Sequence, residues 1–161
     1  MSRPAPVLVL AVGNPSRGDD ALGPALAARL EAAGLPGVEV ITEFQLQVEN
    51  ALDLIGRERV IFIDAGSGTP APFERRRLAA AADFLHTSHA ISPESVLATY
   101  ERLHGAPAPE AWVLCVRGDS FELGERLSEE ADRRLDPAWE ELRELCLRAE
   151  HLAAGTMRGQ P

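Results

Sequence analysis

The chain has 161 residues, with 16 basic and 25 acidic side chains, so its formal net charge is −9. Because a nucleic-acid-binding protein needs a basic face to neutralise phosphates, this balance argues against that class. A hydrophobic content of 45% rules out a wholly disordered chain, and the length fits a single domain over residues 1–161, with loose ends at 1–6 and 154–161.

Apolar runs and cysteines point to a soluble, cytoplasmic protein. Since no apolar run approaches the roughly 18 residues needed to span a bilayer, we expect no membrane segment. The N-terminus has one Arg and no apolar region followed by a cleavage site, so no signal peptide is predicted. Cys115 and Cys146 are far apart in apolar surroundings, which fits neither a disulfide framework nor a zinc knuckle and favours a reducing compartment.

Predicted strands and helices alternate along the chain. Apolar runs predict strands, and four-residue apolar spacing or capping residues predict helices. In chain order these are strand 7–12, helix 21–33, strand 38–42, helix 48–55, strand 60–63, strand 73–78, helix 92–103, strand 112–116 and a short helix from 128 that restarts at 136 as the last helix. The segment 73–78 carries three consecutive arginines, which suits an edge strand. Asp136 and Pro137 predict that the last helix stops and restarts in a new direction.

This alternation predicts an α/β fold with a mostly parallel sheet and helices on both faces. In such sheets ligands bind beyond the carboxyl ends of the strands. Three candidate groups lie there: Asp20 in the loop after the first strand, Asp64 at the end of the third, and His89 before the helix that Ser92 begins. If the first and third strands are neighbours, the two carboxylates meet, and with one imidazole they suit a divalent metal such as Ni²⁺ or Zn²⁺.

Each candidate has a structural alternative. Asp20 could cap the first helix, and Asp64 could be a structural carboxylate at a strand end. Asp19 could assist a metal-bound water, support the site from behind, or be a solvated loop acid. His89 could be an ordinary surface histidine, like the other three histidines of the chain. The residues alone leave these alternatives open.

Nucleotide binding is a further alternative, because Gly13 to Gly18 form a turn after a strand. The glycine spacing is not that of a dinucleotide fold, and no Gly-Lys-Ser/Thr follows. Two acids at the helix start would also repel a phosphate.

The segment Gly13-Asn14-Pro15-x-x-Gly18-Asp19-Asp20-x-x-Gly23-Pro24 resembles the signature of the hydrogenase maturation endopeptidases, which process the large subunit of nickel–iron hydrogenases. Three further segments match that family in order and spacing: 63–68 around Asp64, 87–93 around His89, and 117–128. The resemblance covers roughly residues 7–150. It implies a three-layer α/β/α sandwich of the phosphorylase/hydrolase-like kind, with five strands of which one is antiparallel.

The resemblance also implies a function and a site. The expected activity is removal of a C-terminal extension from the large-subunit precursor after nickel insertion. The family's metal-contacting and catalytic positions fall on Asp20, Asp64 and His89. These residues would recognise nickel supplied by the precursor, or hold another divalent metal that activates water directly. Residues 44–47 resemble the subgroup that serves soluble, cofactor-reducing hydrogenases.

Two other functions remain as hypotheses. The chain could be a nickel-binding carrier module without cleavage activity, or a nucleotide-binding regulator. Nucleophilic catalysis is not expected, because no Ser-His-Asp set is evident and Cys115 lies in mid-strand.

Overall fold

The structure is a computed structural model that describes residues 3–81 and 91–155. In chain order the strands are β1 (Val7–Val12), β2 (Val38–Glu43), β3 (Arg59–Gly66), β4 (Phe73–Leu78) and β5 (Glu110–Arg117). The α-helices are α1 (Leu22–Ala33), α2 (Pro93–His104) and α3 (Glu129–Gly155), and two 3₁₀ helices are η1 (Gly18–Ala21) and η2 (Val48–Leu54). None of the helices in the described ranges is both long and apolar enough to cross a membrane.

The strands form one mixed sheet in the order β2-β1-β3-β5-β4. The neighbouring strands β2, β1, β3 and β5 are parallel to one another, and β4 pairs antiparallel with β5 at the edge. The predicted charged edge strand at 73–78 is therefore confirmed, with the bounds expected. Its Arg75 and Arg77 lie over the ring of Trp112 on the neighbouring strand.

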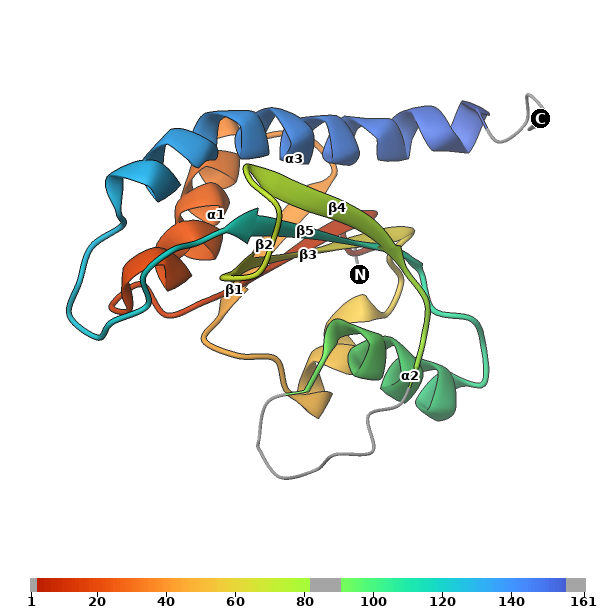
Figure 1. Ribbon diagram of the computed structural model, residues 1–161. Helices are drawn as coiled ribbons and strands as arrows, with labels where there is room; N and C mark the ends of the chain where they lie inside the picture. The colour runs from red at the N-terminus through yellow and green to blue at the C-terminus, as the bar shows by residue number, and fades with distance from the viewer. Residues whose placement is uncertain (1–2, 82–90, 156–161) are drawn as a thin grey trace.

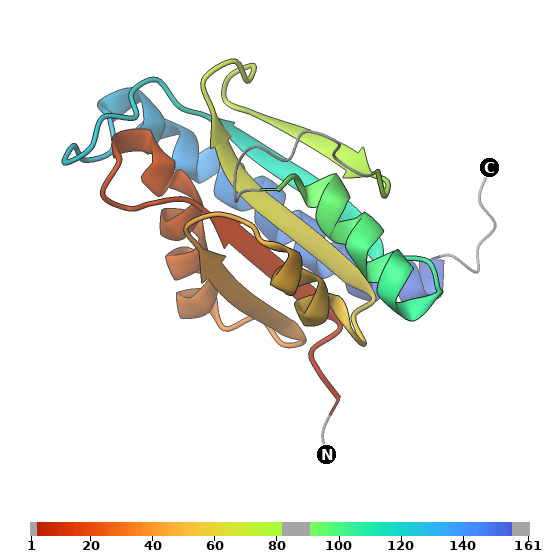
Figure 2. The same cartoon turned by 90° about the horizontal axis from the view of Figure 1, so that it is seen from below.

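Helices cover both faces of the sheet, as Figure 1 shows, with α1 and α3 on one side and α2 on the other. Seen from below, α2 and η2 lie side by side over this face of the sheet (Figure 2). Alternate residues of each central strand point to opposite faces, so Val7 and Val9 join the core under α1 and α3 while Leu8 and Leu10 join the core under α2 and η2. The three-layer α/β/α arrangement is therefore confirmed.

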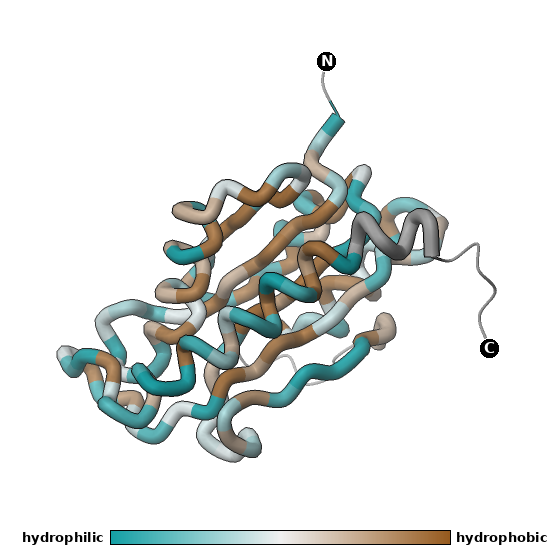
Figure 3. The backbone as a smooth tube through the Cα atoms, turned by 90° about the horizontal axis from the view of Figure 1, so that it is seen from above, coloured by the Kyte–Doolittle hydropathy of each residue, from teal (hydrophilic) through white to brown (hydrophobic). Residues whose placement is uncertain are grey.

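The hydropathy of the chain follows this arrangement. In Figure 3 the central strands are largely hydrophobic, β4 is largely hydrophilic, and α3 alternates between the two. The alternation along α3 corresponds to a buried stripe on the sheet side of the helix, made of Ala131, Leu135, Ala138, Leu142, Leu145 and Cys146.

The prediction that the last helix restarts at Asp136 and Pro137 is wrong, because α3 is continuous and carries Pro137 inside it. A proline in a helix interior removes one backbone hydrogen bond and costs about 3 kcal/mol. The buried stripe continues on both sides of Pro137, from Leu135 to Ala138, so packing on one core offsets that loss.

The two chain ends also differ from the prediction. The helix reaches Gly155, two residues into the expected loose C-terminal end. At the N-terminus the carbonyl of Pro6 accepts hydrogen bonds from the backbone N–H groups of Glu58 and Arg59, and the Arg57 side chain donates to the carbonyl of Ala5. Residues 5 and 6 are thus fixed to the start of β3.

Candidate functional site

The loop after β1 folds back over the end of its own strand, and two glycines make this possible. A Cβ atom on Gly13 would lie 2.0 Å from the carbonyl oxygen of Asp20, and one on Gly23 would lie 2.4 Å from that of Val12. Gly13 also has a φ of 152°, which L side chains rarely adopt. These glycines let η1, which carries Asp20, sit directly at the carboxyl end of β1.

Asp20 lines a cavity beyond the ends of β1 and β2. Its Oδ2 accepts a hydrogen bond of 2.7 Å from the backbone N–H of Asn14, which holds the carboxylate against the loop. The cavity has a volume of about 510 Å³. It is lined by Asn14, Arg17, Asp20, Glu43, Phe44, Gln45 and Gln47. The predicted position at the carboxyl edge of the sheet is therefore correct for Asp20. Neither η1 nor α1 has a side-chain hydrogen bond at its N-cap, so Asp20 does not serve as a helix cap.

Asp64 lies on β3, the strand next to β1 in parallel register. Burial raises its pKa to about 6; the backbone N–H of Ala65, which donates to its Oδ1 at 2.8 Å, lowers the pKa, and the negative charge of Asp20 raises it further. The two carboxylates are thus close enough to interact electrostatically, although Asp64 is not among the residues lining the Asp20 cavity. A carboxyl group whose pKa is raised towards neutral pH by burial and a like charge is typical of functional sites.

The third predicted residue, His89, lies outside the described residues. Within residues 3–81 and 91–155, no three His, Cys, Asp or Glu side chains gather closely enough to hold a metal ion. Asp20 and Asp64 therefore supply two carboxylates, and the complete predicted set of three remains a prediction.

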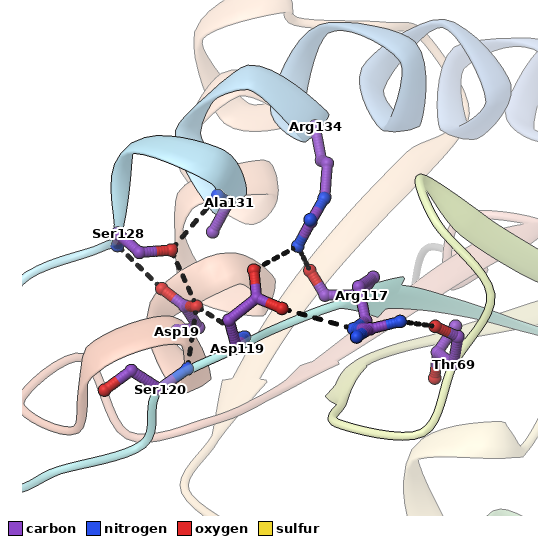
Figure 4. A network of polar contacts seen from close by, with 8 residues as sticks. All are labelled: Asp19, Thr69, Arg117, Asp119, Ser120, Ser128, Ala131 and Arg134. Carbon is purple, nitrogen blue, oxygen red and sulfur yellow. Dashed lines mark hydrogen bonds and ion pairs between the residues drawn. The ribbon is translucent and has the colours of Figure 1, made fainter.

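Asp19, next to Asp20, occupies a different environment. Its side chain is fully buried and accepts four hydrogen bonds (Figure 4). Two come from the backbone N–H and the hydroxyl of Ser128, and one each comes from the backbone N–H groups of Asp119 and Ser120. Burial raises its pKa, but these hydrogen bonds lower it more, so the net effect is a pKa below the usual value. Of the alternatives for Asp19, the geometry fits support from behind the site and not a solvated acid.

Sequence reasoning missed two charged residues of the cavity, Arg17 and Glu43. Glu43 ends β2 in register with Val12 of β1, and its carboxylate accepts a hydrogen bond of 3.0 Å from the Asn50 side chain. The strand-end rule that identified Asp64 also applies to Glu43, and it could have identified this residue.

Cys115 lies on β5 opposite Asp64 in the parallel register. Burial raises the pKa of its thiol, and its Sγ lies 3.0 Å from the Thr69 hydroxyl oxygen. Since the thiolate is the nucleophilic form, this environment disfavours nucleophilic catalysis by Cys115, as expected from the sequence.

A larger cavity, of about 640 Å³, lies elsewhere, between Phe73 on β4 and the outer face of α3. It contains no strand-end carboxylate and is far in sequence from the signature segment. The chemistry of the side chains, and not cavity size, places the candidate site at the ends of β1 and β3.

Comparison with known proteins finds similar chains among the solved structures. No family model matches the chain, and no curated protein matches it. Among solved structures, the chain is similar to HybD, a hydrogenase maturating endopeptidase from E. coli, with a TM-score of 0.69 and 26% identity over 92% of this chain and 94% of that one. It is also similar to HycI, a hydrogenase maturation protease from Thermococcus kodakarensis, with a TM-score of 0.66 and 21% identity over 87% and 91% of the two chains. A hydrogenase 2 maturation peptidase from a Thaumarchaeota archaeon has the same fold, with a TM-score of 0.62 and 23% identity over 90% and 98%.

Proposed function

We infer from this likeness that the chain is a member of the hydrogenase maturation endopeptidase family, and therefore a peptidase. On this premise we propose that it removes the C-terminal extension of a nickel–iron hydrogenase large-subunit precursor after nickel insertion. The substrate is a protein that already carries its nickel, so the metal arrives with the substrate. The observation that carries the proposal is a pair of neighbouring carboxylates: Asp20 in η1, which follows β1, and Asp64 near the end of the adjacent parallel strand β3.

The chemistry of this pair suits nickel recognition. Carboxylates and imidazoles are ligands that divalent metals of borderline hardness accept, and Asp20, Asp64 and His89 would contribute three. Both carboxylates are held by a backbone N–H group, Asp20 by Asn14 and Asp64 by Ala65, which leaves oxygen lone pairs of each carboxylate for a metal. A cation between them would also offset the cost of burying the Asp64 charge, which raises the pKa of Asp64, and the smaller repulsion from Asp20.

This arrangement explains how the protease could select precursors that already carry nickel. A precursor without nickel would lack the contact to Asp20, Asp64 and His89 and would bind more weakly. We therefore propose that nickel acts first as a recognition element that places the scissile peptide at the cavity beside Asp20. Hydrolysis adds water across that peptide bond and releases the extension.

The test is mass spectrometry of a purified precursor incubated with this protein, with and without nickel, starting with the soluble cofactor-reducing type of hydrogenase. We expect the precursor to lose the mass of its extension only when it carries nickel. Asp20→Asn and His89→Ala should abolish this loss, whereas Asp136→Asn, at a side chain that is 84% exposed, should not.

If either Asp20→Asn or His89→Ala still trims the precursor at the normal rate, the site assignment is wrong. If the wild-type protein binds nickel tightly but the precursor mass never changes, the carrier hypothesis is correct and the proposed cleavage is refuted.

A further inference from the structure

The side chain of Asp19 joins two loops that are about a hundred residues apart in sequence. Its Oδ1 accepts from the backbone N–H of Ser128 at 2.7 Å. Its Oδ2 accepts from the backbone N–H groups of Asp119 and Ser120, at 2.7 and 3.1 Å, and from the Ser128 hydroxyl at 2.9 Å. With four donors and full burial, this carboxylate has neither the access nor the free lone pairs needed to contact a substrate.

The backbones of the same two loops are also hydrogen-bonded to each other. The N–H of Gly18 donates to the carbonyl of Glu125 at 3.0 Å, and the N–H of Asp19 donates to that of Ser120 at 2.7 Å. The approach is close, since a Cβ on Gly18 would lie 2.5 Å from the Ser120 carbonyl oxygen. As a result η1, which carries Asp20, is fixed to the segment between β5 and α3.

The segment between β5 and α3 is in turn fixed to the loop that follows Asp64. The Asp119 carboxylate pairs with Arg134 at 2.7 Å and with Arg117 at 3.3 Å, and Arg117 donates to the carbonyl of Thr69 at 3.0 Å (Figure 4). The N–H of Gly118 donates to the carbonyl of Gly66, two residues after Asp64, at 3.1 Å. One segment, residues 117–128, therefore contacts η1, which carries Asp20, and also the end of β3 two residues beyond Asp64.

We propose that Asp19 is a positioning residue that sets the placement of Asp20 relative to Asp64 through the 117–128 segment. This proposal rests on the proposed function, because it deepens the account of the same site. Asp19 touches neither substrate nor metal; it acts by holding η1, and thereby the hydrogen bond from Asn14 that orients the Asp20 carboxylate. Loss of Asp19 should leave Asp20 present but poorly placed.

The donors around Asp19 explain why an amide cannot replace it. All four partners donate to the carboxylate, three of them as backbone N–H groups that cannot reverse their role. In Asp19→Asn the new NH₂ group therefore faces an N–H donor on one side, and at least one buried donor is left without a partner. Ser128→Ala is a milder change, since it removes only the hydroxyl donor to Asp19 and the bond from Ala131 N–H to that hydroxyl.

The experiment compares Asp19→Asn and Ser128→Ala with Leu142→Ala, a control that lowers stability from the α3 core without touching these loops. Urea unfolding gives the global stability of each variant. Hydrogen exchange of the Asn14 amide then reports the Asp20 contact without any substrate. Turnover of the nickel-loaded precursor, divided into kcat and KM, reports the site.

We expect Asp19→Asn and Ser128→Ala to speed exchange at Asn14 by about tenfold or more beyond the effect of global stability. They should lower kcat by a similar factor with KM within about twofold, because the substrate-contacting groups remain. Leu142→Ala should change neither quantity beyond its loss of stability. If Asp19→Asn fails to fold, Ser128→Ala carries the test.

Exchange and kcat that follow global stability equally in Ser128→Ala and Leu142→Ala would overturn the positioning role. Failure of the wild-type protein to process any precursor would refute the proposed function instead. In that case the exchange of Asn14 still decides whether Asp19 holds Asp20.

Discussion

Replacing Asp64 with Asn should make the protein more stable at neutral pH while removing its activity. In the folded protein, burial and the charge of Asp20 raise the pKa of Asp64 to about 6, compared with 3.8 for the free group. The ionised form is therefore unfavourable in the native state. Asn has no charge to bury, and its side-chain oxygen can still accept the hydrogen bond from the backbone N–H of Ala65.

The magnitude follows from the shift in pKa. Each pKa unit corresponds to 1.36 kcal/mol, so a shift of about two units predicts a stabilisation of about 3 kcal/mol. Because the folded pKa is raised, this difference is fully present above pH 6, decreases as the pH falls, and is lost below the unfolded value of 3.8. For a chain of this length, about 3 kcal/mol corresponds to a rise in Tm of roughly 6–12 °C.

The assay is urea and thermal unfolding of the chelator-treated protein at a series of pH values between 4 and 8. Asp64→Asn should exceed the wild type at pH 7.5 and converge with it near pH 4. Asp136→Asn, which changes an exposed carboxylate paired with Arg29, should show no such pH-dependent gap. An Asp64→Asn protein that is equally or less stable than the wild type at pH 7.5 would refute the reasoning that Asp64 is ionised at a cost.

Two further predictions concern packing. Gly23→Ala should lower the free energy of unfolding, measured by urea titration, by about 1–3 kcal/mol, since its Cβ would meet the backbone oxygen of Val12. The control Gly68→Ala, whose Cβ would meet nothing within 4 Å, should change this free energy by less than about 0.5 kcal/mol, and equal effects of the two changes would contradict the packing argument. Burial raises the pKa of Cys146 to about 12, so at pH 8 iodoacetamide should modify this thiol only as fast as the protein unfolds, and should modify the half-buried Cys115 first by peptide mass analysis; early labelling of Cys146 in the folded protein would show that α3 is not packed as described.

The elements of the fold that could be predicted were those with a local signal. The continuously apolar runs at 7–12 and 112–116 gave strands within a few residues of β1 and β5, because strands buried on both faces carry such runs. The continuity of α3 through Pro137 had no local signal. It depends on the core beneath α1 and α3, to which residues on both sides of the proline contribute.

The site shows the same division. The positions of Asp20 and Asp64 followed from one rule, that ligands bind at the carboxyl ends of parallel strands. The sequence could not decide between the alternatives for Asp19, because three of its four donors are backbone N–H groups that lie 100 to 109 residues away. Backbone donors carry no residue-type signal, so only the three-dimensional arrangement distinguishes a buried anchor from a solvated loop acid.

The carboxylates of Asp19 and Asp64 lie in opposite electrostatic environments. Asp19 is stable as a buried anion because four donors surround it, whereas the ionised Asp64 has one backbone donor and a like charge nearby. A site that keeps the poorly compensated Asp64 close to a second carboxylate must be held by other contacts, and the 117–128 segment supplies them. A divalent cation would offset the unfavourable electrostatics, so nickel bound to the folded state should stabilise the wild type by an amount set by the nickel concentration and its affinity. Addition of Ni²⁺ should accordingly raise the Tm of the wild type more than that of Asp64→Asn. An equal rise in both proteins would show that the Asp64 carboxylate has no part in binding the metal.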